Sequence, residues 1–169
     1  SMTSQANRIR LGKTVHEFWN SGDATVTDNG VVRKYSAGSL DDAQKEIREV
    51  LHADVPEFYY IPKGMEYTGF YVLQEVQTAA IKYRYNEHSV YFQVAANEKD
   101  LSQANWKDKE KVQVETLDDT VEVEMGTISE NEEENYYAIW KYRDFYYELS
   151  GQIEKEELLK ILSEMQYNL

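Results

Sequence analysis

Near residue 58 the hydrophobic pattern changes from a helical period to the twofold alternation of strands, which restricts the chain to a helix followed by a sheet. Between residues 39 and 51 the apolar residues recur every three or four positions, which predicts an amphipathic helix. Ser39 is a suitable N-cap, and Asp42 completes a capping box. Pro56 cannot continue the helix, so we expect it to end by residues 52 to 55.

From Phe58 onward apolar and polar residues alternate, which is typical of an antiparallel sheet with one solvent-exposed face. The polar segments Asn86–Ser89, Leu117–Asp119 and Arg143–Asp144 are expected as hairpin turns. The alternation predicts about seven strands, at 67–76, 78–85, 89–95, 112–114, 121–125, 136–142 and 145–149, and a short apolar strand piece at 58–61 precedes them.

A second helix is expected at about residues 155 to 165, and its buried side consists of Leu158, Ile161, Leu162 and Met165. The order helix, meander, helix predicts the α+β class. We expect a single curved antiparallel sheet, with an N-terminal and a C-terminal helix packed on one face.

The first 36 residues differ from the rest in charge. They carry five basic and three acidic side chains, a net charge of +2, whereas residues 37–169 carry −15. Asn29-Gly30 lies between short apolar segments and predicts a hairpin at about 24 to 35. Before it, apolar residues are spaced as on one face of a helix, although Gly12 interrupts them: Leu11, Val15, Phe18 and Trp19. We therefore divide the chain into a basic arm (1–36) and an α+β domain (37–169).

Composition excludes several classes of function. A net charge of −13 argues against nucleic-acid binding, and the absence of cysteine excludes disulfides and thiolate metal sites. The histidines His16, His52 and His88 lack the spacing of a zinc-binding helix face, so no metal is expected. The acidic stretch from Glu115 to Glu134 lacks the pattern of a calcium loop, and we expect a solvated strand face and loop there, with weak divalent-cation binding as the alternative.

No motif of catalysis is present. The sequence has no nucleophile elbow, phosphate-binding glycine loop or dinucleotide fingerprint, and therefore no cofactor is expected. A pair of carboxylates could hydrolyse glycosides only if it were held across a sugar site. With 31 acidic residues some pairs arise by chance, so we expect no enzyme and keep a cell-wall glycan hydrolase as a remote alternative.

Tyrosine is unusually frequent, at 14 of 169 residues, and three adjacent pairs occur at 59/60, 136/137 and 146/147. Neighbours in a strand point to opposite faces, so each pair places one ring in the core and one outside. One interpretation is strand propensity with cross-strand pairing of rings. The other is that outward rings line a groove for a glycan, lipid or peptide, and the candidates are Tyr91, Tyr137 and Tyr146.

Several segments, in this order and spacing, are similar to a known family. They are Tyr60–Met65, Ala80–Tyr85, Asn105–Lys107, Tyr136–Trp140 and Tyr146–Gly151, followed by Glu156–Leu158 and Ile161–Leu162. Together they resemble the extracytoplasmic domain of unknown function 4367 of Gram-positive bacteria, over about residues 40 to 168.

This resemblance implies a C-terminal ectodomain behind one membrane helix, in proteins that sometimes carry an anti-sigma-factor-like cytosolic part. It also implies a fold akin to periplasmic lipoprotein carriers, and no established catalytic residues. We therefore expect a non-enzymatic extracytoplasmic sensor or ligand-binding domain, with an envelope ligand or protein as partner. A soluble lipid or lipopeptide carrier with an apolar cavity is the alternative.

The expected anchor is a membrane helix upstream of this chain, which itself holds no apolar run of about 18 residues. Ser1-Met2 resembles the remnant of a cleaved tag, so we expect the native gene to continue upstream of Thr3. The basic arm would then lie beside an anionic membrane surface.

Overall fold

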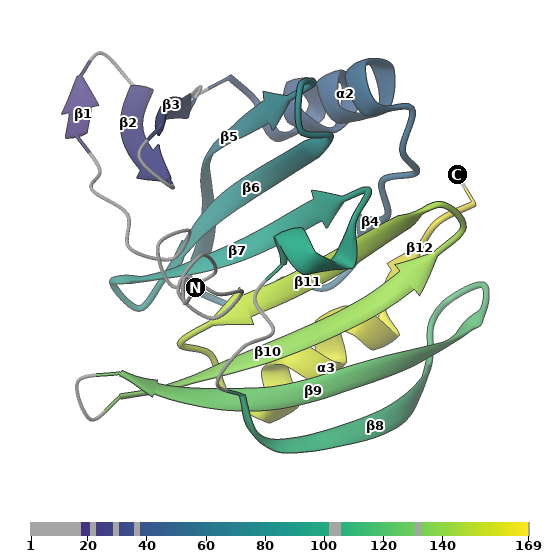
Figure 1. Ribbon diagram of the computed structural model, residues 1–169. Helices are drawn as coiled ribbons and strands as arrows, with labels where there is room; N and C mark the ends of the chain where they lie inside the picture. The colour runs from purple at the N-terminus through teal and green to yellow at the C-terminus, as the bar shows by residue number, and fades with distance from the viewer. Residues whose placement is uncertain are drawn as a thin grey trace.

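A seven-stranded antiparallel sheet is the centre of the structure, a computed structural model that describes residues 18–20, 23–28, 31–35, 38–101, 106–130 and 133–168 (Figure 1). The strand order is β5-β6-β7-β11-β10-β9-β8. Two meanders, β5 to β7 and β8 to β11, are joined through the pairing of β7 with β11. The strands are β5 (Met65–Leu73), β6 (Thr78–Tyr85), β7 (His88–Ala95), β8 (Lys107–Glu115), β9 (Thr120–Glu130), β10 (Glu133–Tyr142) and β11 (Phe145–Gly151).

Two longer helices cover one face of this sheet, α2 (Leu40–Leu51) and α3 (Lys155–Ser163). The predicted capping box of α2 is present: Asp42 N donates to Ser39 Oγ at 3.1 Å, and Ser39 N donates to Asp42 Oδ2 at 3.2 Å. Apolar residues of both helices belong to one buried cluster with the sheet, so both pack on the same face (Figure 1). The predicted α+β class, with a seven-stranded antiparallel sheet, an N-terminal helix and a C-terminal helix, is confirmed.

Aromatic rings fill the layer between the sheet and the helices. Phe92, Trp140 and Tyr147 are at most 2 % exposed, and their ring centroids lie 5.9 to 6.4 Å apart. Ile47 of α2 and Leu158 of α3 are buried in the same cluster. Side chains thus occupy the centre of this layer, where a lipid carrier would need an open apolar cavity.

The opposite side of the sheet is here called the outer face. It was expected to be solvent-exposed, but it is partly covered. A second buried cluster lies there and contains Ala95, Leu101, Trp106, Ile128, Tyr137 and Ile139. Polar side chains of this face are buried as well: Lys82 is 6 % exposed and Glu148 is fully buried. Burial lowers the pKa of Lys82 to about 8, because desolvation disfavours its charged form. Alternation therefore predicted which residues face outward, but not how much of that face is covered.

The first of the predicted strand segments and a segment near the C-terminus form a small two-stranded sheet of their own, which was not expected. The expected strand at 58–61 is limited to β4 (Glu57–Phe58), which pairs with β12 (Met165–Gln166) and not with the main sheet. Helix α3 therefore ends earlier than expected, at Ser163. Backbone bonds from Tyr59 N to Glu164 O and from Leu117 N to Met165 O hold this C-terminal segment.

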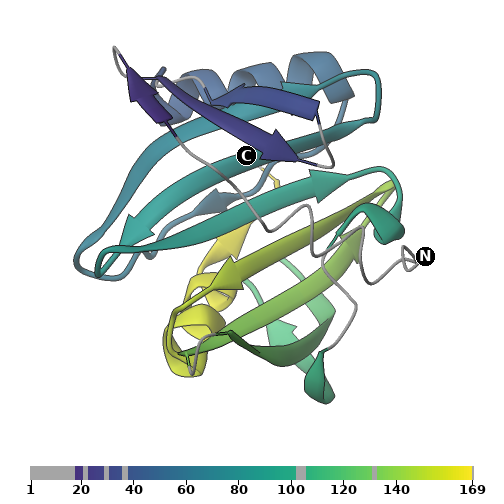
Figure 2. The same cartoon turned by 60° about the vertical axis from the view of Figure 1, so that its left-hand side comes forward.

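The N-terminal part contains a three-stranded antiparallel sheet of β1 (Phe18–Asn20), β2 (Asp23–Asp28) and β3 (Val31–Tyr35), with β3 beside β5 (Figure 2). Strands β2 and β3 pair from Ala24 to Tyr35, while the Asn29-Gly30 turn lies outside the described residues. The helical interpretation is wrong for Phe18 and Trp19, which lie in β1, and Leu11 and Val15 lie outside the described residues. The division of the chain at residue 36 stays a prediction.

Candidate functional site

The three candidate tyrosines all lie on the outer face, but only two of them line the same pocket. Tyr91 of β7 and Tyr137 of β10 are both paired with Ser150 of β11, from its two sides. Tyr146 lies farther along β11, packs against the second buried cluster, and has the Lys141 ammonium 5.4 Å from its ring centroid. The structure therefore brings Tyr91 and Tyr137 together and leaves Tyr146 apart.

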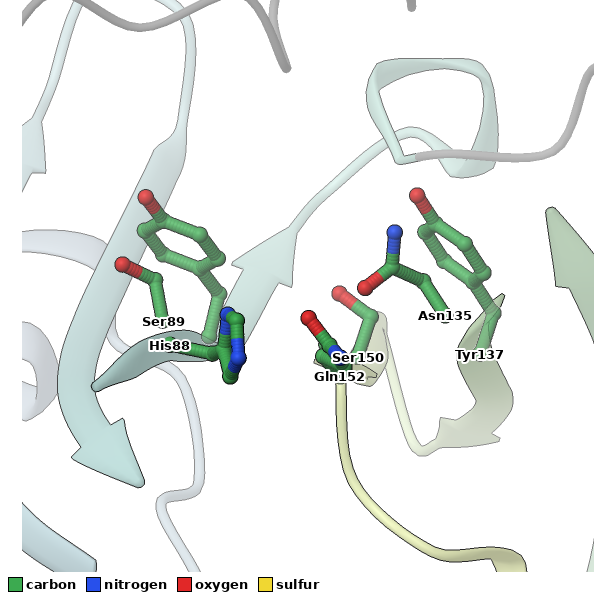
Figure 3. A pocket seen from close by; sticks show the side chains of 8 residues that line it. His88, Ser89, Asn135, Tyr137, Ser150 and Gln152 are labelled. Carbon is green, nitrogen blue, oxygen red and sulfur yellow. The ribbon is translucent and has the colours of Figure 1, made fainter. Parts of the chain in front are cut away.

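The pocket around Ser150, here called the tyrosine pocket, has a volume of about 220 Å³. In Figure 3 the side chains of Asn135 and Ser150 point toward its middle, between His88 and Tyr137. Three strand ends supply its walls: the start of β7, the start of β10 and the end of β11. The lining residues are His88, Ser89, Tyr91, Asn135, Tyr137, Ser150, Gly151 and Gln152.

Gly151 allows these strands to approach each other. Its φ of +153° lies in a region that residues with a side chain rarely adopt. A Cβ at this position would lie 2.5 Å from the Ser89 carbonyl oxygen and 2.9 Å from Val90 Cα. Only glycine therefore fits between β11 and β7 here, and this close approach places Ser89 and Ser150 in one pocket.

The tyrosine pocket is neutral although the chain is strongly acidic. None of the described residues that line it is Asp, Glu, Lys or Arg. Burial raises the pKa of Tyr91, and its hydrogen bond with Ser89 acts in the opposite direction. Tyr91 therefore remains an uncharged phenol that can donate and accept hydrogen bonds.

A second pocket of about 360 Å³ adjoins the first and is here called the rim pocket. His88 and Gln152 line both pockets. The other residues that line the rim pocket are Tyr85, Asn86, Glu134, Tyr136, Ile153 and Glu154. It therefore continues from the tyrosine pocket around the end of the sheet toward the start of α3.

Two tyrosine–carboxylate pairs give the rim pocket its charge. Tyr85 Oη donates to Glu154 Oε1 at 2.9 Å, and Tyr136 Oη donates to Glu134 Oε1 at 3.1 Å. Desolvation and then the bond to Glu154 raise the pKa of Tyr85 to about 12. The bond to Glu134 is the main cause that raises the pKa of Tyr136. Both phenols therefore stay protonated and orient their carboxylates.

A family model, for a domain of unknown function (DUF4367), matches residues 55–165. The chain belongs to the DUF4367 family. The matched segment contains the whole seven-stranded sheet, helix α3 and every residue that lines the two pockets. Neither the curated proteins nor the solved structures hold a match to this chain.

Within the described residues of the DUF4367 chain, no group of three or more His, Asp or Glu side chains is placed to hold a metal ion. Nor is any helix in that part of the chain long and apolar enough to cross a membrane. His88 lies at the meeting point of the two pockets, His52 is the C-cap of α2 in a left-handed conformation, and His16 lies outside the described residues.

Sequence reasoning missed most of the polar residues of the DUF4367 pockets. His88 and Ser89 belonged to a predicted hairpin loop, and Asn135 to a predicted acidic loop. Their common signal is position: each lies where a strand begins or ends. That signal becomes useful only once the pairing of β7 with β11 is known, and no local pattern encodes this pairing.

Proposed function

We propose that this DUF4367 domain is a non-enzymatic ligand-binding ectodomain whose tyrosine pocket recognises the neutral, hydroxyl-rich part of a saccharide of the cell envelope. The tyrosine pocket supports this proposal through the kind of polar groups that line it. Serine and tyrosine hydroxyls and carboxamides each combine donor and acceptor capacity. Sugar hydroxyls have the same dual capacity, whereas an anionic ligand would call for lysine or arginine.

The packing of the domain favours this role over that of a lipid carrier. A carrier shelters an acyl chain between sheet and helices, but Phe92, Trp140 and Tyr147 occupy the centre of that layer. The tyrosine pocket instead opens at the surface and mixes ring faces with hydrogen-bonding groups. Such a mixture suits an amphipathic ligand such as a sugar ring.

The same pocket favours binding without hydrolysis. Glycoside hydrolysis uses two carboxyl groups that flank the scissile bond. No described residue that lines the tyrosine pocket carries a carboxyl group. A sugar ring held in the tyrosine pocket would therefore have no pair of carboxyl groups beside it.

The proposal includes a place outside the cytoplasmic membrane, behind a membrane helix. It is supported by the resemblance to extracytoplasmic members of the family and by the net charge of +2 in residues 1–36, which would face anionic lipids. We expect the native reading frame upstream of Thr3 to encode an apolar stretch of about 20 residues. Sequencing that region checks this, and a native start codon at Met2 would contradict the membrane anchor.

The saccharide role is tested with two side chains that line the tyrosine pocket. Asn135→Ala and Gln152→Ala are each expected to lower the affinity for a neutral tetrasaccharide by about tenfold, because each removes about one hydrogen bond to the ligand. Isothermal titration calorimetry with cellotetraose and tetra-N-acetylchitotetraose measures this effect.

Gln113→Ala is the matched control, because Gln113 is an exposed amide on β8 that lines neither pocket. Its affinity should equal that of the unchanged chain. If the unchanged chain binds none of the tetrasaccharides tested, chitotetraose included, or if Gln113→Ala weakens binding as much as the pocket variants, the proposed function is wrong.

A further inference from the structure

We propose that the saccharide bears a free amino group, which binds as an ammonium ion in the rim pocket. This inference rests on the proposed function and specifies its ligand class as an amino sugar oligomer.

The tyrosine pocket and the rim pocket lie next to each other. His88 and Gln152 line both pockets, so the two pockets are direct neighbours. The two volumes are about 220 and 360 Å³, which together exceed the space that one sugar ring needs. A ligand of two or more rings held in the tyrosine pocket therefore continues into the rim pocket.

The two pockets differ in the charged residues that line them. The described residues of the tyrosine pocket include no Asp, Glu, Lys or Arg, whereas the rim pocket has Glu134 and Glu154 and no described Lys or Arg. The nearby ammonium of Lys155 is already engaged, at 2.6 Å from Glu110 Oε2. Along the groove the surroundings therefore change from neutral to negative, which favours a ligand that is neutral at one end and positive at the other.

The two carboxylates of the rim pocket can accept further hydrogen bonds. Each carboxylate accepts one hydrogen bond from a tyrosine, Tyr85 for Glu154 and Tyr136 for Glu134. A carboxylate offers about four acceptor positions, so both keep positions for a further donor. In the part of the chain that the structure describes, neither forms an ion pair with a lysine or arginine.

The donor that fits best is an ammonium group on a ring. It supplies three N–H donors, and the Tyr85 and Tyr136 rings add polarisable walls beside it. A divalent cation fits less well, because it prefers six or more oxygen ligands and the described rim pocket contributes only two carboxylates.

The inference is tested by comparing two tetrasaccharides that differ only in their amino groups. Chitotetraose, with four free amines, and tetra-N-acetylchitotetraose are titrated into the full chain at a pH where the amines are protonated. We expect the free amine form to bind about tenfold more tightly, and this advantage to shrink as salt is added.

Charge-neutral variants assign the advantage to the rim pocket. Glu134→Gln and Glu154→Gln should each weaken chitotetraose binding by about threefold, because each removes an exposed ion pair between a carboxylate and a ligand ammonium. The affinity for the acetylated form should stay within about twofold of that of the unchanged chain. Glu49→Gln, which removes an exposed carboxylate on α2 away from both pockets, is the control and should change neither affinity. Because all three side chains are exposed, the variants are expected to fold.

The outcomes separate the two proposals. If the acetylated form binds as well as or better than chitotetraose, the amino-sugar inference is overturned and the saccharide role stands. If neither binds, both proposals fail. A Gly-Lys-Gly tripeptide serves as an amine without sugar: if it binds as tightly as chitotetraose and depends equally on Glu134 and Glu154, the ligand is a peptide and the saccharide assignment is overturned.

Discussion

Gly151→Ala is expected to lower the free energy of unfolding by about 3 kcal/mol, one of the two largest effects predicted for this chain. The added Cβ would lie 2.5 Å from the Ser89 carbonyl oxygen, which is backbone and cannot turn away. The strands β7 and β11 would have to separate at the floor of the tyrosine pocket. Urea unfolding followed by tryptophan fluorescence measures the change.

Gly64→Ala separates this clash from backbone strain. Gly64 also has a positive φ, +88°, but its nearest neighbour to an added Cβ is Asn86 Oδ1 at 3.8 Å. Strain alone should lower the free energy of unfolding by about 1 kcal/mol at this position. Equal losses in the two variants would show that β7 and β11 do not approach as closely as described.

Tyr167→Ala is expected to destabilise the domain by about 4 kcal/mol, because it removes a large buried ring from the end of the core. Tyr167 is 8 % exposed and stacks on Tyr142 with ring centroids 3.8 Å apart. Its hydroxyl accepts a hydrogen bond from the indole nitrogen of Trp140 at 2.9 Å, so the variant also leaves a buried donor without this acceptor. Chemical denaturation of both forms gives the difference.

Two further variants help to interpret the loss of stability in Tyr167→Ala: one removes only the hydroxyl, and the other is an exposed control. Tyr167→Phe keeps the ring and removes the hydroxyl, which bonds with Trp140 and Tyr147, so a loss of about 1 to 2 kcal/mol is expected. Tyr59→Ala removes a tyrosine that is 58 % exposed, and a change of at most about 0.5 kcal/mol is expected. If Tyr167→Ala were as mild as Tyr59→Ala, the C-terminal segment would not close the core.

Local patterns predicted the parts of the fold that local interactions determine. Ser39 and Asp42 sit three residues apart, and the apolar stripe of α2 repeats within a dozen residues, so this helix was visible in the sequence. The strands of the two meanders were visible for the same reason, because each pairs with its neighbour in sequence.

Long-range features escaped prediction because their partners are far apart in the chain. The pairing of β4 with β12 joins residues near 58 to residues near 165. The covered part of the outer face depends on Trp106 lying against Gly126, where a Cβ would meet the indole ring at 2.5 Å. No periodicity distinguishes this glycine from one in an ordinary strand.

For the candidate site, the tyrosine pattern supplied two of the residues that the tyrosine pocket contains, Tyr91 and Tyr137. Tyr146 shares their outward direction but lies along β11 at a different cross-strand row, beside Lys141 and Ala95. The difference is one of register between strands, which a single sequence does not contain. Whether any of these rings contacts a ligand stays a prediction.

The tyrosine pocket lies at the junction of the two meanders, and each meander supplies part of it. His88, Ser89 and Tyr91 come from the first meander, while Asn135, Tyr137 and Ser150 come from the second. The facing residues Tyr91 and Ser150 are 59 positions apart, and such distant contacts carry a large loop-closure entropy and form slowly. A chain in which only one meander has folded holds half of the binding groups. Ligand recognition would thus require both meanders to be folded and paired, and a bound ligand would stabilise the pairing of β7 with β11.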